Sequence, residues 1–406
     1  MKLFGGEPMP FVIRKTLPPA AAPIPLRHIF SGIIGLFKGN HAVSDFEQQL
    51  CRFYLVRHCR AVSSGKAALS LLLEALHELN PERDEVLIPA YTCYSVPSAI
   101  IRAGLRVRLC DLAPDSLDFD YQQLEELLNN PRILSVIPTH LYGMPSDVAR
   151  IRKISGKLGV YVVEDAAQAM GGEWNGSKLG TLGDAAILSL GRGKAFSTVE
   201  GGIILTDSHL IGRAVNRKVD AIAGCTFLDQ LKKMFYAVAI SMLIHPLIYW
   251  LPKSLPFLKL GETHFDTTFT IKKFSGFQAG LAKNWCSRLS EFRKSRAKKV
   301  ARYAACYGFP LPKDFTSPPD LIRFPVLAKS REDKLRLLRD SELQCLGVAD
   351  GYPDSIDGIA GLDTGSVDKK YPAAKKLADQ LLTLPLHLFV SEVDQNRIAG
   401  LIRKLG

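Results

Sequence analysis

The chain has 406 residues, 47% of them hydrophobic and 23% charged, and a formal net charge of +12. This composition is that of an ordinary globular protein with a sizeable core, and the length allows two domains. The eight cysteines form no CxxC pair and have no histidine cluster beside them, which argues against a disulfide framework or a metal site and indicates reduced thiols in a cytoplasmic protein. The positive charge favours anionic partners, but no nucleic-acid-binding motif accompanies it, so we expect no nucleic acid.

The first residues predict an irregular arm without a signal peptide. Four prolines between residues 18 and 25 prevent a regular helix. An amphipathic helix is expected over residues 43–54. The segment AVSSGKAALSLLLEALHEL then predicts a short strand, a turn and an apolar helix that begins near Ser64 and Gly65. Free N–H groups at this helix start suit a phosphate, and Lys66 would add positive charge; a plainly capped core helix is the alternative.

Strands and helices then alternate along the chain. Strands are expected over residues 85–91, 106–112, 133–140 and 161–167, and helices over residues 96–104, 120–128 and 146–159. Short apolar strands that alternate with helices predict a mainly parallel sheet covered on both faces. In such sheets ligands lie at the carboxyl ends of the strands, where Thr92, Asp111, His140 and Asp165 stand.

Residues 162–202 are expected to carry the chemistry. An apolar strand ends on Glu164 and Asp165, and strands over residues 185–190 and 201–207 flank a short loop that contains Lys194. The short loop predicts that these two strands are antiparallel. A carboxylate and a lysine at the ends of neighbouring strands suit pyridoxal phosphate, whose aldehyde bonds to a lysine and whose ring nitrogen is kept protonated by an acid. A salt bridge in an ordinary α/β core is the alternative.

Two other kinds of site fit this sequence less well. Lys66 and Lys194 each follow Gly, but both are followed by Ala and lack the earlier Gly of a P-loop. Ser189 could be combined with His140 and Asp165 as a hydrolase triad, but the Gly-x-Ser-x-Gly turn is missing.

A long apolar run begins at Met234 and ends at Pro252, and it contains no Asp, Glu, Lys or Arg. His245 and Pro246 interrupt it, which argues against a membrane-spanning helix. Burial against the core or a partner subunit is one interpretation, and a place on the membrane surface is the other. Basic residues on both sides and the Tyr249-Trp250 pair suit the membrane surface.

The rest of the chain predicts a smaller α/β unit. A long helical stretch is expected first, over residues 275–303, with its basic run RKSRAKKVARY on a solvated face. A strand is then expected over residues 321–328 and a strand that leads into a loop over residues 345–353. Helices are expected over residues 331–342, 372–384 and 391–405. We therefore expect a large domain over residues 1–260, with the apolar insertion near residues 228–260, and a small domain over residues 261–406.

The order of several motifs resembles the DegT/DnrJ/EryC1/StrS aminotransferases. The motifs are SSGKAAL, IPAYTCYS, HLYGMPSD, VVEDAAQAMGG and SLGRGKAFSTVEGG, and IRFPVLA, GVADGYP and SEVDQNRI extend the resemblance to the end of the chain. The resemblance implies a fold-type I α/β architecture, with a large domain around a mainly parallel sheet and a smaller C-terminal α/β domain. It also implies pyridoxal 5'-phosphate as cofactor and a homodimer with a shared active site.

The resemblance also assigns roles by position. Lys194 would form the Schiff base and transfer protons, Asp165 would contact the ring nitrogen, and Gln168 would contact the phenolic oxygen of the ring. The other cofactor-binding residues that it implies are Ser64, Gly65, Lys66, Cys93 and Ser189. The family usually has Thr at the position of Lys66, and at that of Cys93 an aromatic ring that Tyr91 or Tyr94 would supply instead.

The activity that the resemblance implies is transfer of an amino group to a keto-sugar on a nucleotide or lipid-linked carrier, with glutamate as the expected donor, in the biosynthesis of amino sugars and cell-surface polysaccharides. Relatives that dehydrate sugars have histidine at the position of Lys194, so its presence favours transamination. One alternative is a pyridoxal phosphate enzyme of another type, such as an eliminating or dehydrating enzyme. A catalytically idle, membrane-associated relative is the other. The expected location is the cytoplasm, at the inner membrane surface if the apolar run contacts lipid.

Overall fold

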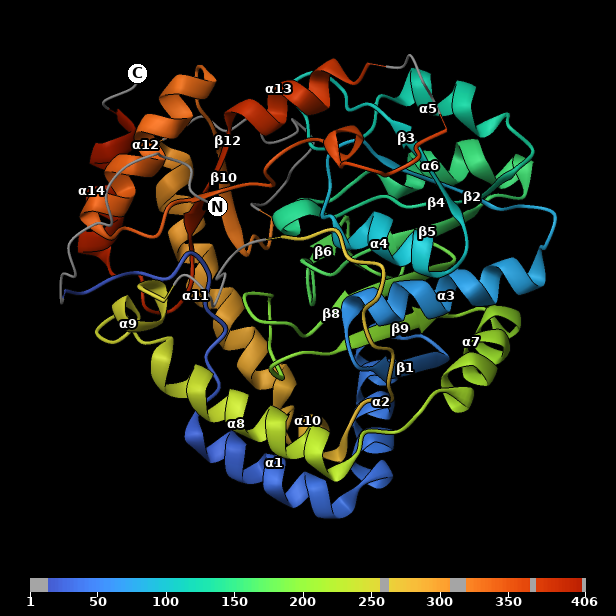
Figure 1. Cartoon of the computed structure of the whole chain (residues 1–406), viewed down its shortest axis with the longest axis horizontal. Coiled ribbons are helices and arrows are strands. Elements are labelled where there is room, and N and C mark those ends of the chain that lie inside the picture. The colour runs from blue at the N-terminus through green and yellow to red at the C-terminus, as the bar shows by residue number, and fades with distance from the viewer. Residues whose placement is uncertain (1–13, 256–262, 307–318, 366–369, 404–406) are drawn as a thin grey trace.

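The structure, a computed structural model, describes residues 14–255, 263–306, 319–365 and 370–403. Most strands belong to two sheets, a seven-stranded sheet and a three-stranded sheet (Figure 1). The expected fold-type I architecture is confirmed, with a large, mainly parallel sheet and a smaller α/β unit. The predicted domain boundary between residues 260 and 261 lies outside the described residues and stays a prediction.

The seven-stranded sheet is parallel except for one strand. Its order is β1 (His58–Val62), β9 (Gly202–Thr206), β8 (Ala185–Ser189), β5 (Tyr161–Asp165), β4 (Ile133–Val136), β2 (Glu85–Pro89) and β3 (Arg106–Cys110). β9 is antiparallel to both of its neighbours, which confirms the antiparallel pair expected around the Lys194 loop. β5 and β8 are parallel, so their carboxyl ends lie on the same edge of the sheet.

Helices cover both faces of this sheet, as the alternating pattern predicted. The helices on one face are α3 (Gly65–Leu79), α4 (Ser95–Arg102) and α7 (His209–Ala221). Those on the other face are α5 (Tyr121–Leu128), α6 (Val148–Ser155), α2 (Asn40–Tyr54) and α11 (Trp285–Cys306). A short hairpin of β6 (Glu173–Trp174) and β7 (Ser177–Lys178) follows β5. Burial on both faces explains why the strands are continuously apolar.

A helix that we did not predict, α1 (Leu26–Lys38), follows the arm, whose described residues 14–25 contain no helix or strand. α1 packs closely on α10 (Gly276–Leu281). A Cβ atom at Gly35 would lie 2.3 Å from the carbonyl oxygen of Gly276, so only glycine allows this approach. Gly32 and Gly35 of α1 also lower the helix propensity of this segment, so its sequence does not indicate a helix clearly.

The apolar run forms most of α8 (Phe227–Leu243) and the short α9 (Trp250–Lys253). Thr226 caps α8 in a capping box with Asp229. Across the residues that the structure describes, none of the helices combines the length and apolar character needed to cross a membrane. The interpretation that the apolar run is buried against the core is wrong for most of α8, because Phe235 is 68% exposed and only Lys233 and Ala237 of the helix are buried.

The helical stretch expected over residues 275–303 is two helices, α10 and α11. Asn284 separates them with a φ of 57°, a left-handed conformation that asparagine adopts more readily than most residues. The solvated face expected for the basic run is wrong in part, because Arg296 and Lys299 of this run are buried.

The small sheet has the order β10 (Arg323–Leu327), β12 (Leu381–Pro385) and β11 (Ala349–Asp350), all antiparallel. The helices beside it are α12 (Arg331–Gln344), α13 (Pro372–Gln380) and α14 (Glu392–Arg403). The helix expected over residues 372–384 is too long, because residues 381–385 form the buried central strand β12. The chain after β11 packs into the same core as α3 and α4, next to the carboxyl edge of the large sheet.

Candidate active site

The carboxyl edge of the large sheet brings Asp165 and Lys194 together. Asp165 is the last residue of β5, and Lys194 lies in the loop after the neighbouring strand β8. Burial raises the pKa of Asp165, while the N–H of Ala167 and the charge of Lys194 oppose that rise. Within the described residues, the carboxylate accepts one hydrogen bond, from Ala167 N–H to Oδ1 at 3.0 Å. One oxygen therefore remains for a donor such as a ring N–H.

Glu164 points to the opposite face of β5, because side chains alternate along a strand. Its buried carboxylate accepts backbone N–H groups in residues 180–183 and the Nε2 of His140, at 2.9 Å. Nδ1 of His140 accepts the N–H of Ser146, so the proton of the ring is on Nε2. Glu164 thus fixes the turn that leads toward β8.

A cradle for an anion lies where α3 begins. Ser64 caps this helix by accepting the N–H of Ala67 at 3.1 Å. The first residue, Gly65, faces the end of β8: a Cβ atom on Gly65 would lie 3.1 Å from Cβ and 3.2 Å from Oγ of Ser189. Glycine keeps this space open. A helix start with unpaired N–H groups beside a serine hydroxyl is suited to a phosphate.

Lys66, expected beside the phosphate, already has partners. Its Nζ lies 3.2 Å from Oδ2 of Asp266 and 4.6 Å from the ring centroid of Phe269. Both belong to the segment after residue 262, which passes the start of α3, where Ser63 N–H donates to the carbonyl of Lys272. The Lys66 charge is therefore partly balanced, which leaves the backbone N–H groups as the main anion donors of this cradle.

Tyr352, a residue that we did not predict, reaches the site from the chain that follows β11. Its hydroxyl accepts a hydrogen bond from Nε2 of Gln168 at 2.8 Å, and its N–H donates to the hydroxyl of Tyr91 at 2.8 Å. The N–H of Tyr142 donates to Oε1 of Gln168 at 3.1 Å. Burial raises the pKa of Tyr352 well above its usual value, so the phenol stays neutral. Gln168 is thereby held at the edge where Asp165 ends its strand.

The ring expected near Cys93 has three candidate sources. Cys93 is half-buried, its Sγ lies 3.3 Å from Oγ of Ser95, and its proximity adds to the raised pKa of the Tyr352 phenol. The hydroxyl of Tyr94 donates to the carbonyl of Asp354 at 3.3 Å. Tyr91 and Tyr94 therefore both point toward the chain around Tyr352. Tyr352 is itself the third candidate for the ring beside Cys93.

Two buried arginines of α11 hold the residues that follow Lys194. Nη1 of Arg296 donates to the carbonyl of Ala195 at 3.2 Å, and the guanidinium of Arg288 lies 4.5 Å from the ring centroid of Phe196. Burial lowers the pKa of each arginine to about 10. Arg296 stands in the basic run, which concealed this role in the sequence. We interpret them as positioning residues for the Lys194 loop.

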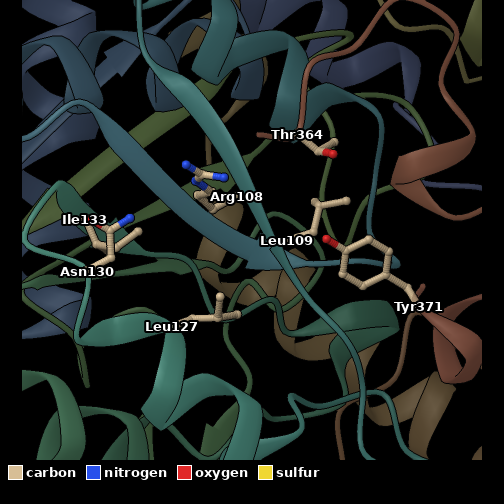
Figure 2. Close-up of a pocket in the computed structure, with 7 residues that line it drawn as sticks. All are labelled: Arg108, Leu109, Leu127, Asn130, Ile133, Thr364 and Tyr371. Carbon is tan, nitrogen blue, oxygen red and sulfur yellow. The ribbon is translucent and has the colours of Figure 1, made fainter. Parts of the chain in front are cut away.

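A separate cavity of about 200 Å³ lies beside β3, the outer strand of the sheet (Figure 2). Its lining includes Arg108 in the middle of β3, Asn130 just before β4 and Ile133 at the start of β4. Arg108 and Asn130 both donate to the buried carboxylate of Glu85. These two polar side chains of the lining are thus engaged in structure, and the cavity is distinct from the Asp165 and Lys194 site.

A family model for the DegT/DnrJ/EryC1/StrS aminotransferase family matches residues 35–403. The chain belongs to this family. GDP-perosamine synthase of Vibrio cholerae is 30% identical over 169 residues, 42% of this chain and 45% of that protein. The dTDP-3-amino-3,4,6-trideoxy-alpha-D-glucose transaminase of Micromonospora megalomicea subsp. nigra is 23% identical over 90% of this chain and 89% of its own. The match with the first of these relatives spans less than half of its length.

Solved structures share the fold over nearly the whole chain. PseC of Helicobacter pylori, an aminotransferase involved in the biosynthesis of pseudoaminic acid, has a TM-score of 0.75 at 15% identity and covers 97% of this chain and 99% of its own. The PLP form of the putative sugar aminotransferase Spr1654 of Streptococcus pneumoniae has a TM-score of 0.74 at 19% identity, with 96% and 98% covered. Pyridoxal phosphate is the cofactor of this family.

The residues at the carboxyl edge fit that cofactor. Asp165 has an oxygen free for the ring N–H, and burial alone would disfavour its charge, which a neighbouring cation would stabilise. The cradle between Gly65 and Ser189 has room that a Cβ atom would fill. Gln168 and Lys194 lie at the same edge. The cofactor roles of these residues, and of Ser64, Lys66 and Cys93, remain predictions.

Proposed function

We propose that this protein is a pyridoxal-phosphate-dependent aminotransferase that moves an amino group, with glutamate as donor, to a keto-sugar on a nucleotide or lipid-linked carrier. The observation that carries the proposal is the position of Lys194 beside the buried Asp165, one strand away from the cradle at Gly65. The family match supports the reaction class, and relatives named for sugar transamination support the substrate class.

Each residue has a defined task in this proposal. The cofactor supplies an electron sink and an aldehyde that carries the amino group. Lys194 would hold the cofactor and move the proton between the two carbon atoms that exchange the amino group. Asp165 would keep the ring nitrogen protonated. Ser189 and the start of α3 would hold the phosphate, while Gln168 would orient the ring from the side.

The experiment is a spectroscopic half-reaction. Purified protein with pyridoxal phosphate should absorb visible light, and glutamate should bleach this band with release of 2-oxoglutarate. Lys194→Ala should lose the band, whereas Lys153→Ala, a control on the exposed side of α6, should keep it. A wild-type protein that stays colourless with added cofactor would refute the proposal. Bleaching without 2-oxoglutarate release would favour elimination or dehydration, which the relatives do not favour.

The sugar is then identified by a panel of nucleotide-linked keto-sugars offered to the amino form of the enzyme. Recovery of the visible band reports a substrate, and mass spectrometry of the product locates the new amino group. No recovery with any nucleotide-linked sugar, but recovery with a lipid-linked one, would assign the carrier.

We also propose that the protein works as a homodimer in the cytoplasm, with a peripheral membrane contact through the run from Met234 to Pro252. The exposure of Phe235 and Met242 in this run supports a contact of this kind. The mass of the purified protein in solution tests the dimer.

A further inference from the structure

α8 exposes the side that a core helix would bury. Its outward stripe contains Leu228, Leu231, Phe235 and Met242, which are 43–73% exposed. These residues are spaced three, four and seven positions apart and therefore share one face of the helix. The inward side is narrower, with Ala237 fully buried. Exposed apolar surface of this extent usually marks a contact with a partner or a membrane.

α1 carries a second stripe of the same kind. Leu26, Phe30, Ile34 and Phe37 are spaced four, four and three positions apart, and Phe37 is 83% exposed. The opposite side of α1 faces α10 through Gly32 and other small or apolar residues.

The two stripes belong to one side of the molecule. α1 and α8 lie next to each other at the edge of the protein (Figure 1), and both pack inward on α10, where Ile29 and Ala237 share a buried cluster with Phe277. Their outward stripes therefore face away from the body of the protein. We call the exposed apolar residues of α1 and α8 together the α1–α8 surface.

Apart from Asp229, the charged residues of the two segments that carry this surface are basic. Residues 26–38 and 230–255 contain Arg27, Lys38, Lys232, Lys233 and Lys253 and no Asp or Glu. Lys233 and Lys253 form ion pairs with glutamates of other segments. The acid that opens α8, Asp229, is bound by Lys272. An apolar face with a basic rim is complementary to an acidic lipid surface.

We propose that the α1–α8 surface binds the acidic surface of a lipid bilayer, with both helices lying in the plane of the interface. The proposal rests on the membrane contact proposed above, adds α1 to it, and does not depend on the transamination. A second copy of the chain is a poorer occupant, because a twofold interface would place basic rim against basic rim. Tyr236 of α8, an exposed aromatic residue, also suits the headgroup region.

Vesicle sedimentation tests this surface with the full-length protein. The probes are vesicles of phosphatidylcholine alone and of equal parts phosphatidylcholine and phosphatidylglycerol. We expect sedimentation with the acidic vesicles, and its loss in the double variant Phe30→Glu, Phe235→Glu. The double variant Leu210→Glu, Val393→Glu, which alters exposed apolar residues on α7 and α14, should still sediment. Lys38→Ala and Lys232→Ala should each weaken partition about fivefold.

Solution mass and the glutamate half-reaction are measured on the same samples. Unchanged mass and activity in the Phe30, Phe235 variant, together with lost sedimentation, support the proposal. A wild-type protein that ignores acidic vesicles overturns it, and so does a variant that still sediments. A variant whose mass falls shows that the surface joins two copies instead. Vesicle binding without a half-reaction in the wild type would refute the aminotransferase proposal alone.

Discussion

The cradle between α3 and β8 can be tested by adding a single methyl group. Gly65→Ala would place a Cβ atom 3.1 Å from Cβ and 3.2 Å from Oγ of Ser189, closer than ordinary contact, so Ser189 or the cofactor phosphate must move. Such overpacking typically costs about 1–3 kcal/mol. If this cost falls on the bound state, the dissociation constant of pyridoxal phosphate should rise about 5- to 150-fold.

The fold itself should tolerate the change. Gly65 begins α3 without a left-handed φ, and alanine is a better helix residue than glycine by about 0.5–1 kcal/mol. This gain offsets part of the cost of the contact with Ser189, so the melting temperature of the cofactor-free protein should fall only slightly. Gly400→Ala in α14 is the matched control, because a Cβ atom there meets no atom within 4 Å. It should leave cofactor affinity unchanged.

Titration of cofactor-free protein with pyridoxal phosphate, followed by visible absorbance and by thermal unfolding, measures both quantities. Wild-type affinity in Gly65→Ala would refute the assignment of the phosphate to this cradle. A large fall in the melting temperature of the cofactor-free variant would instead show that the space serves packing of α3 against β8.

Three further substitutions probe the rest of the site. Asp165→Asn should lower the half-reaction rate about a hundredfold or more. Because burial raises the pKa of this carboxyl, the cofactor-free wild type loses stability as the pH rises through that pKa. In unfolding titrations the cofactor-free variant should therefore be more stable than the wild type at neutral pH, and the difference should shrink in acid. Arg296→Met should slow the half-reaction about tenfold, a loss of about 1.4 kcal/mol, and Arg296→Lys should restore part of the rate. Lys298→Met, on the exposed side of α11, should leave the rate unchanged. Equal rates for Arg296→Met and the wild type in stopped-flow assays would refute the positioning role of Arg296. Tyr352→Phe breaks the hydrogen bond to Gln168 and should shift the visible band and raise the cofactor dissociation constant about 2- to 10-fold; an unchanged spectrum and affinity would separate this tyrosine from the cofactor.

The predictions that held depend on patterns within short segments. Apolar strands of the large sheet were recognisable because burial on both faces selects continuous apolar runs, and Ser64 marked a helix start because its side chain caps the local backbone. The position of Asp165 at the end of its strand follows from the same local pattern. The motif order then indicated the family.

The sequence-based predictions that were wrong concern features that depend on contacts between distant segments of the chain. The single helix expected over residues 275–303 is broken at Asn284. The basic run that we expected on a solvated face contains the buried Arg296, whose partner Ala195 lies 101 residues earlier and leaves no signal near it in the sequence. α1 was missed because its glycines make sense only against the backbone of α10.

The sequence by itself therefore determined the class of fold, the edge of the sheet that carries Asp165 and the loop that carries Lys194, since local apolar periodicity and short connections specify these. Only the tertiary structure decided which side chains surround that edge. Tyr352 reaches Gln168 across 184 residues, and α8 turns its apolar stripe outward because α10 already fills its inward side. Neither packing arrangement leaves a pattern in any one segment of the chain.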